Sequence, residues 1–392
     1  MFDFDMDAKR KRHYVIVLVC VFIHYSFSFL FPLLSLLLIR VGGFSDQEST
    51  MVMAAGYLIS GGMMPWIGRR FDAGVVWPII GVGLVGVLLG TFGLMWFDHN
   101  LLSVLGVTVA FLIGLGVLQT ATYSFVEAGV ASAYRAQASS LLAAVGNMGF
   151  LVSAALAYYF LSTHETILLT LDALTSVIYF AGLALAIVAV SRSRKQDHGS
   201  RSDQDASPLP WRELTGSFLL SIPLFCHFSA IPLLYRSWGL DSVKYTSVIV
   251  FVSSVFVIAI GIPVSRNLIL RSHRLKLVIA ATLTALGSAL VPLVSNQLEN
   301  ILVTSVWAAG EVLIYPVTAV AIYAGFRDDE GGRAAGIKTF IFRLCMVVVP
   351  LITLPLLSAP RFTYSWLIGL CPLVGAVLIW PAVAKSDRDS KA

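Results

Sequence analysis

Glu311 and Arg343 are charged side chains inside two consecutive apolar runs of the sequence. Glu311 is the one carboxylate of the stretch AAGEVLIYPVTAV, which runs from Ala308 to Val320. A carboxylate inside a bilayer is costly unless it is paired, protonated or in contact with water. The long guanidinium side chain of Arg343 could reach Glu311, or an anionic group of a ligand. The two residues therefore predict either a fixed ion pair or a site that gains and loses a proton.

The depth of Glu311 favours the proton site. A carboxyl group in an apolar cavity holds a proton more strongly, whereas a nearby guanidinium favours its ionised form. At the helical rise of about 1.5 Å per residue, Glu311 lies roughly 20 Å from the nearer cytoplasmic helix end, close to the membrane midplane. His227 lies at a similar depth, and imidazole titrates near neutral pH. We therefore predict proton coupling through Glu311, tuned by Arg343 and His227.

Several polar and aromatic residues inside apolar runs could shape a binding pocket near this depth. Aromatic rings with a few polar atoms suit amphipathic or cationic organic ligands. The alternative is that they pack between helices or lie in aromatic belts at the membrane surface. The predicted substrate-binding residues are His24, Tyr25, Tyr57, Gln119, Tyr123, Asn147, Trp307 and Tyr315.

Motifs of soluble enzymes and of metal or cofactor sites are absent from the sequence. There is no HExxH, no glycine-rich phosphate loop followed by Lys-Ser/Thr, no G-x-S-x-G and no CxxC. The four cysteines fall inside apolar runs, which argues against a disulfide framework or a zinc site. We therefore expect a protein that is not an enzyme, with no cofactor and no metal.

The composition is that of an integral membrane protein. Of the 392 residues, 57% are hydrophobic and 12% are charged, about half the charged share of a typical soluble protein. The apolar residues form runs of about 20, long enough to cross a bilayer. We predict an all-α fold with twelve transmembrane helices, at 14–37, 49–67, 76–96, 101–126, 137–162, 166–191, 214–235, 244–265, 275–296, 300–325, 335–358 and 362–384.

The basic residues indicate the orientation of these spans. With the N-terminus in the cytoplasm, most of the 27 Lys and Arg fall in cytoplasmic segments, as the positive-inside rule requires. The loops on the other side hold Arg40, Arg236, Lys244 and Arg361, and Arg343 remains inside a span. We expect a multi-pass protein of the inner (plasma) membrane with both termini in the cytoplasm. The net charge of +5 therefore needs no nucleic-acid partner.

A polar segment divides the chain into two similar halves. Residues 193–213 are rich in Ser, Asp and Arg and predict a flexible cytoplasmic linker. Residues 1–192 and 214–392 would each form a six-helix bundle. Pro65 in PWIGRRFD and Arg135 in RAQASS have counterparts equally far along the chain, Pro263 in PVSRNLIL and Arg333 in RAAGIK. Matches at equivalent loop positions predict a duplicated six-helix unit.

These features together resemble the major facilitator superfamily. The segment PWIGRRFDAG supplies Gly68, Asp72 and Gly74 of that family's loop signature, although the basic residues usually found after the Asp are missing. The resemblance implies a central cavity between two halves that rock against each other. It also implies that Gly68, Asp72 and Arg135 form a latch at the cytoplasmic ends of the helices, the alternative being that these are ordinary loop charges.

A narrower resemblance concerns proton-coupled multidrug exporters. GEVLIYP, from Gly310 to Pro316, is similar to a G-E-x-x-x-x-P segment of that branch, in which the Glu takes part in drug binding and proton coupling. Arg135 followed by Asn147 and Gly149 is similar to a second element of the branch. The antiporter segment with its proline is absent from NMGFLVSAALA, and Ala110 stands where many members have Arg.

Three functions follow as expectations. The first is proton-coupled export of an organic compound, either drug-like or a secreted metabolite, by alternating access. The second is proton-coupled uptake of a small anionic metabolite, with Arg343 binding its carboxylate. The third, from another class, is a non-transporting membrane sensor or enzyme. The partners we expect are the small-molecule substrate, protons and the lipid bilayer, and we expect a monomer.

Overall fold

The chain folds into long α-helices joined by short turns and single turns of 3₁₀ helix. The computed structural model describes residues 8–28, 34, 38–39, 43–96, 100–160, 165–194, 207–265 and 272–389, and these ranges contain no β-strand. The helices are α1 (Ala8–Phe27), α3 (Asp46–Asp72), α4 (Trp77–Trp96), α5 (Leu101–Val126), η1 (Ser132–Tyr134), α6 (Arg135–Phe160), α7 (Glu165–Arg194), α8 (Trp211–Ser237), α9 (Ser242–Ser265), α10 (His273–Leu290), η3 (Val291–Leu293), α11 (Gln297–Tyr323), η4 (Asp328–Glu330), α12 (Gly331–Leu356) and α13 (Arg361–Asp389).

The length and composition of these helices confirm a multi-pass, all-α membrane fold. Within the described ranges, nine helices are long and apolar enough to cross a membrane, and ten if the two bent segments of α8 count as one span. The count of twelve spans and the internal duplication stay predictions. Helix α7 continues to Arg194 and α8 begins at Trp211, so the predicted linker is helical at both of its ends.

Polar side chains define the starts of several helices between the apolar segments. The Ser45 hydroxyl accepts a hydrogen bond from the Glu48 amide, and the Glu48 carboxylate accepts one from the Ser45 amide, so α3 begins with a capping box. Asn296 caps α11 in the same position through the Glu299 amide. Such caps satisfy amides that have no partner within the helix.

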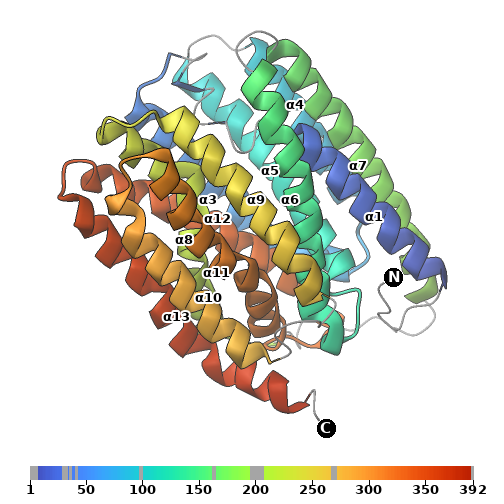
Figure 1. The fold of residues 1–392 in the computed structure, drawn as a ribbon. Coiled ribbons are helices and arrows are strands. Elements are labelled where there is room, and N and C mark those ends of the chain that lie inside the picture. The colour runs from blue at the N-terminus through green and yellow to red at the C-terminus, as the bar shows by residue number, and fades with distance from the viewer. Residues whose placement is uncertain are drawn as a thin grey trace.

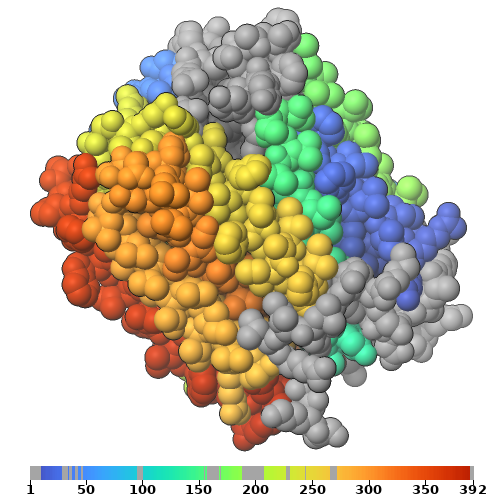
Figure 2. Space-filling view, viewed as in Figure 1, coloured from blue at the N-terminus to red at the C-terminus, as the bar shows by residue number. Residues whose placement is uncertain are grey.

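The first and second halves of the chain have their most extensive contacts along two helix pairs. In Figure 1 the helices α1, α4, α6 and α7 lie on the right, and α8, α10, α11 and α13 lie on the left. Between them, α3 packs along α12 and α6 packs along α9. Figure 2 shows α9 in yellow directly against α6 in green on the viewer's side.

Helices α3 and α12 approach each other closely because glycines face the contact. A side chain at Gly68 would meet the backbone of Gly332, and one at Gly336 would meet the backbone of Met64. Nearer the middle, a β-carbon at Gly61 would lie 2.9 Å from the Arg343 Cβ. Glycine allows backbone-to-backbone contact between membrane helices. This contact places the middle of α12, with Arg343, directly beside α3.

The helix ends near both termini also join the halves. α1 begins and α13 ends on the lower right side of the bundle in Figure 1, and we call this side the terminal end. The end of α3, the beginning of α6 and the beginning of α12 also lie there. Ser207, at the end of the predicted linker, donates its amide to the Glu330 carboxylate at 3.0 Å and accepts from Arg333 at 2.8 Å.

Candidate functional site

A cavity lies between the two halves, near the middle of the helices. Its volume is about 1,090 Å³, including solvent space at its mouth, and its walls come from α1, α5, α6, α7, α8, α9, α11 and α12. The site residues predicted from the sequence that line it are Tyr25, Gln119, Tyr123, Asn147, Glu311, Tyr315 and Arg343. The structure therefore brings together the predicted coupling carboxylate, the predicted arginine and five of the eight predicted substrate-binding residues.

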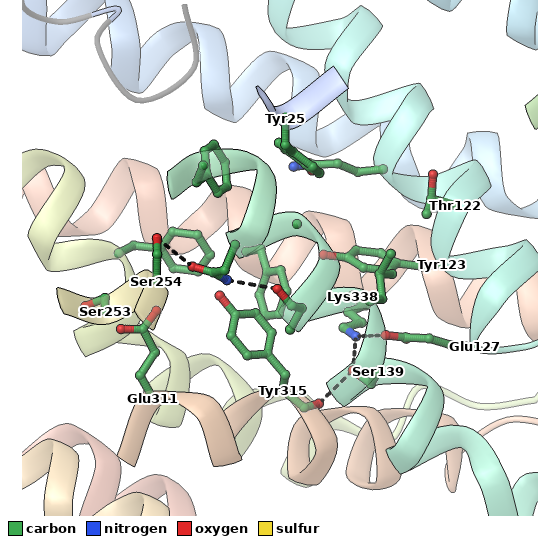
Figure 3. A pocket seen from close by; sticks show the side chains of 18 of the residues that line it. Tyr25, Thr122, Tyr123, Glu127, Ser139, Ser253, Ser254, Glu311, Tyr315 and Lys338 are labelled. Atoms are coloured by element: carbon green, nitrogen blue, oxygen red, sulfur yellow. Dashed lines mark hydrogen bonds and ion pairs between the residues drawn. The ribbon is translucent and has the colours of Figure 1, made fainter. Parts of the chain in front are cut away.

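Glu311 projects into this cavity from α11. The preceding Gly310 packs against the α10 backbone at Thr284, and the next residue, about 100° further round the helix, faces the cavity. The carboxyl group is 3% exposed and lies beside the hydroxyl of Ser253 on α9 (Figure 3). Its Oε2 atom has no hydrogen-bond partner among the described residues. One carboxyl oxygen is therefore available to a ligand or a proton.

Arg343 reaches the cavity from α12 on a different wall. Its Nη2 donates to the Gln119 Oε1 atom at 3.1 Å, and the guanidinium lies 5.2 Å from the ring centre of Tyr57. Its Nη1 has no hydrogen-bond partner among the described residues. No ion pair between Arg343 and Glu311 occurs within the part of the chain that is described. The alternative of a fixed pair does not hold here, because α3 and α5 hold the guanidinium while Glu311 faces α9.

The ion pair that the cavity does contain is Glu127 with Lys338. The Lys338 Nζ atom lies 2.5 Å from the Glu127 Oε1 atom and 3.3 Å from the Ser139 hydroxyl (Figure 3), and both charged side chains are 0% exposed. The ammonium also lies 4.3 Å from the ring centre of Tyr123. Such a position over an aromatic face adds cation–π attraction. This pair joins α5 of the first half to α12 of the second.

Neither residue of this pair is among the site residues predicted from the sequence. Helix α12 begins at Gly331, so Lys338 falls about two turns inside it, beside the end of α5. The apolar residues Ala334, Ala335 and Ile337 just before Lys338 were the available signal.

The predicted latch residues lie at the contact between the halves. Asp72 accepts hydrogen bonds from the backbone amides of Gly332 and Arg333, at 2.6 and 2.7 Å. Arg135 pairs with Asp328 at 2.7 Å. Gly68 packs against Gly332, as described above. Each of the three contacts crosses from one half to the other at the terminal end.

Three predicted site residues with described side chains do not line the cavity, and a fourth has a side chain that the structure does not describe. His24 packs on the Tyr179 ring at 5.1 Å and lies 3.4 Å from the Ser176 hydroxyl, because it faces α7 while its neighbour Tyr25 faces the cavity. Tyr57 lies under the Arg343 guanidinium, and Trp307 packs on Gly287 of α10. His227 belongs to α8, and its side chain lies outside what the structure describes.

Sequence reasoning also missed cavity residues with little local signal. Ser254 donates to the Asn147 Oδ1 atom at 3.4 Å, and Ser139 donates to the Tyr315 carbonyl at 3.1 Å, so hydroxyl groups bridge the halves. Phe150, Phe225 and Phe342 add aromatic walls. Serine and phenylalanine are common in membrane helices, and their spacing alone does not show which face they occupy.

Comparison with known proteins places this geometry in a family. The sequence model of the Major Facilitator Superfamily matches residues 16–350. A sequence comparison with curated proteins gives no match.

Solved structures agree with the family match at the level of the fold. The human organic anion transporter MFSD10 (TETRAN) is similar, with a TM-score of 0.70 and 14% identity over 95% of this chain and 100% of that one. A bacterial homologue of the iron transporter ferroportin, in an outward-facing state with soaked iron, gives 0.70 and 11% over 96% and 99%. The proton:xylose symporter XylE bound to 6-bromo-6-deoxy-D-glucose gives 0.69 and 11% over 95% and 96%. With a family model covering most of its length and a cavity between two helix groups, the chain belongs to the major facilitator superfamily, a family of secondary transporters.

Proposed function

We propose that this transporter exports an organic compound in exchange for protons. The observation that supports this best is Glu311, a buried carboxyl group in the central cavity that has an unpartnered oxygen and no ion pair among the described residues. Burial of an ionised carboxyl group inside the membrane costs free energy unless the group binds a proton or a cationic partner. A proton and a basic group of a substrate are both suited to it.

The cavity residues give this exchange a physical route. When the cavity opens to the side with more protons, Glu311 takes up a proton and the neutral carboxylic acid releases its substrate. When the cavity opens to the cytoplasm, where we place both termini, the proton leaves and the carboxylate binds the next substrate. The aromatic side chains Tyr25, Tyr315 and Phe342 provide an apolar surface for the body of the compound.

A flux assay in proteoliposomes tests this function. With an imposed pH gradient, an antiporter moves its substrate opposite to the proton flux. We expect Glu311→Gln to abolish transport driven by the gradient, because an amide cannot carry a proton. Glu299→Gln, at the exposed start of the same helix, is the matched control and should transport like the unmodified protein. Full transport with unchanged pH dependence in Glu311→Gln would refute proton coupling at this residue.

A second candidate is proton-coupled uptake of a small anionic metabolite. The observation in its favour is the Arg343 Nη1 atom, an unpartnered donor at the cavity wall. In the same liposomes, accumulation of an organic anion in the direction of the proton flux would select this alternative. Saturable binding without any flux would instead select a sensor.

A further inference from the structure

Among the described residues, four charged side chains line the cavity, and they fall into two groups. Glu127 and Lys338 neutralise each other at 2.5 Å. Glu311 and Arg343 are equally buried, at 3% and 2% exposure, but each keeps one polar atom without a hydrogen-bond partner in the described structure. These atoms are a carboxylate oxygen, which accepts, and a guanidinium nitrogen, which donates. The Glu127 Oε2 atom also lacks a hydrogen-bond partner among the described residues, but the charge of Glu127 is matched by Lys338. The described lining therefore offers a ligand two charges without a counter-charge, one carboxylate and one guanidinium.

The two free groups are held on different walls. Glu311 lies beside Ser253 of α9, whereas Arg343 is held by Gln119 of α5 and Tyr57 of α3. Tyr315 stands between Glu311 and the Glu127–Lys338 pair, and Tyr25 lies on the other side of the cavity (Figure 3). Aromatic side chains thus lie near Glu311 and near Arg343.

We propose that the substrate is amphoteric: an apolar or aromatic body with a basic group that pairs with Glu311 and, separated from it, an acidic group that pairs with Arg343. This rests on the proposed function and names the substrate class for the same site. A buried charge without a partner is strongly disfavoured, and charge-assisted hydrogen bonds are the strong ones. A ligand with one charge leaves either Glu311 or Arg343 unpaired, and only a ligand with both satisfies the two walls together.

Protonation of Glu311 changes this requirement in a defined way. A neutral carboxylic acid needs no cationic partner, so a ligand with only an acidic group can then occupy the cavity through Arg343. A ligand with only an acidic group should therefore bind more tightly as the pH falls. In Glu311→Gln this dependence should disappear, because the amide is neutral at every pH.

Binding of matched probes to the purified full-length protein tests the proposal. The zwitterions are 4-(aminomethyl)benzoate and its longer analogue 4′-(aminomethyl)biphenyl-4-carboxylate, and the single-charge partners are benzylamine and benzoate with the corresponding biphenyl amine and acid. We expect at least one zwitterion to bind about tenfold or more tightly than either of its single-charge partners, as measured by calorimetry, because each charged hydrogen bond contributes at least that factor. If neither zwitterion exceeds its partners, the proposal is wrong.

Variants of the two residues should each remove one part of the preference for the zwitterion. In Arg343→Gln the zwitterion should bind no more tightly than the amine, and in Glu311→Gln it should bind no more tightly than the acid. Arg343→Lys keeps the positive charge and should retain most of both preferences. Glu299→Gln and Arg361→Gln, at the starts of α11 and α13 and away from the cavity, should bind like the unmodified protein. Should Arg343→Gln not fold, the loss of the pH dependence of benzoate binding in Glu311→Gln decides the matter, and its persistence would overturn the proposal.

The outcome separates this inference from the proposed function. Tight zwitterion binding that depends on both residues, without flux under a pH gradient, supports the substrate class and refutes proton-driven export. The opposite result is proton-driven flux of another compound that depends on Glu311, while zwitterions bind no better than their single-charge partners. That result supports proton-driven export and refutes the proposed substrate class.

Discussion

At the scale of single residues, the Glu127–Lys338 ion pair has the largest desolvation cost to offset among the described ion pairs, because both of its charges are fully buried. The pair holds α5 against α12 at the wall of the cavity. Removing two charges from water is costly, and a close hydrogen-bonded pair offsets much of that cost. The pair therefore tolerates loss of both partners better than loss of one.

We expect Lys338→Met alone to destabilise the protein by about 3–5 kcal/mol, because it leaves the Glu127 carboxylate buried without a counter-charge. The double variant Glu127→Leu with Lys338→Met should recover most of this loss. Thermal unfolding of the purified variants measures both effects. The pair of Arg212 with Glu213 supplies the control, since the Arg212 side chain is 54% exposed and Arg212→Met should cost no more than about 1 kcal/mol. Equal instability of the single and double variants would contradict this account.

At the scale of elements, glycine sets the distance between α3 and α12. Gly68 faces the backbone of α12, whereas Gly62, on the same helix, has no atom within 4 Å of the position of a β-carbon. The two positions share a helix and differ in what they face. Comparing the stability effect of a substitution at each one therefore separates helix propensity from interhelical contact.

Alanine at these two positions should have opposite effects. Gly62→Ala should be neutral or stabilising by up to about 1 kcal/mol, because alanine favours helix more than glycine does. Gly68→Ala must displace the Gly332 backbone, and we expect a loss of about 1–3 kcal/mol as α3 and α12 move apart. Thermal unfolding compares the two variants directly. Similar stability of both would show that α3 and α12 are not in close contact at Gly68.

At the scale of the whole molecule, the terminal end holds the two halves together. The Asp72 carboxylate accepts from the first amides of α12, which have no partner within their own helix. The Arg135–Asp328 pair lies nearby, but the Asp328 side chain is 88% exposed, and exposed pairs contribute little. Asp72 should therefore oppose separation of the halves more strongly than Asp328 does.

Distances between spin labels test this order. With labels at the exposed residues Arg69, near the end of α3, and Trp211, at the start of α8, double electron–electron resonance reports whether the terminal end is open. We expect Asp72→Ala to enlarge the open population several-fold, in line with the roughly 0.5–2 kcal/mol lost with a helix cap. Asp328→Ala should change it less than Asp72→Ala, because its ion pair is solvent-exposed. A larger effect of Asp328→Ala would assign the latch to the ion pair instead.

Part of the fold and of the site could be predicted from the sequence. Apolar runs of about 20 residues predict membrane helices, because the bilayer thickness and the helical rise act on each segment separately. The same arithmetic placed Glu311 near the middle of its helix, and the structure shows it in the cavity. Depth along a helix is a local property, so a single sequence suffices for it.

Only the tertiary structure decided which side chains meet. Tyr25 faces the cavity while His24 beside it faces α7, and this difference depends on the rotation of α1 against its neighbours. Arg343 is held by Gln119 instead of Glu311, and Lys338 pairs with Glu127, because glycine contacts set how α12 lies between α3 and α5. The sequence determined that Glu311 and Arg343 lie inside apolar helices, and it determined the depth of Glu311. The partners of Arg343 and Lys338 depend on contacts between segments more than 200 residues apart, which no local pattern encodes.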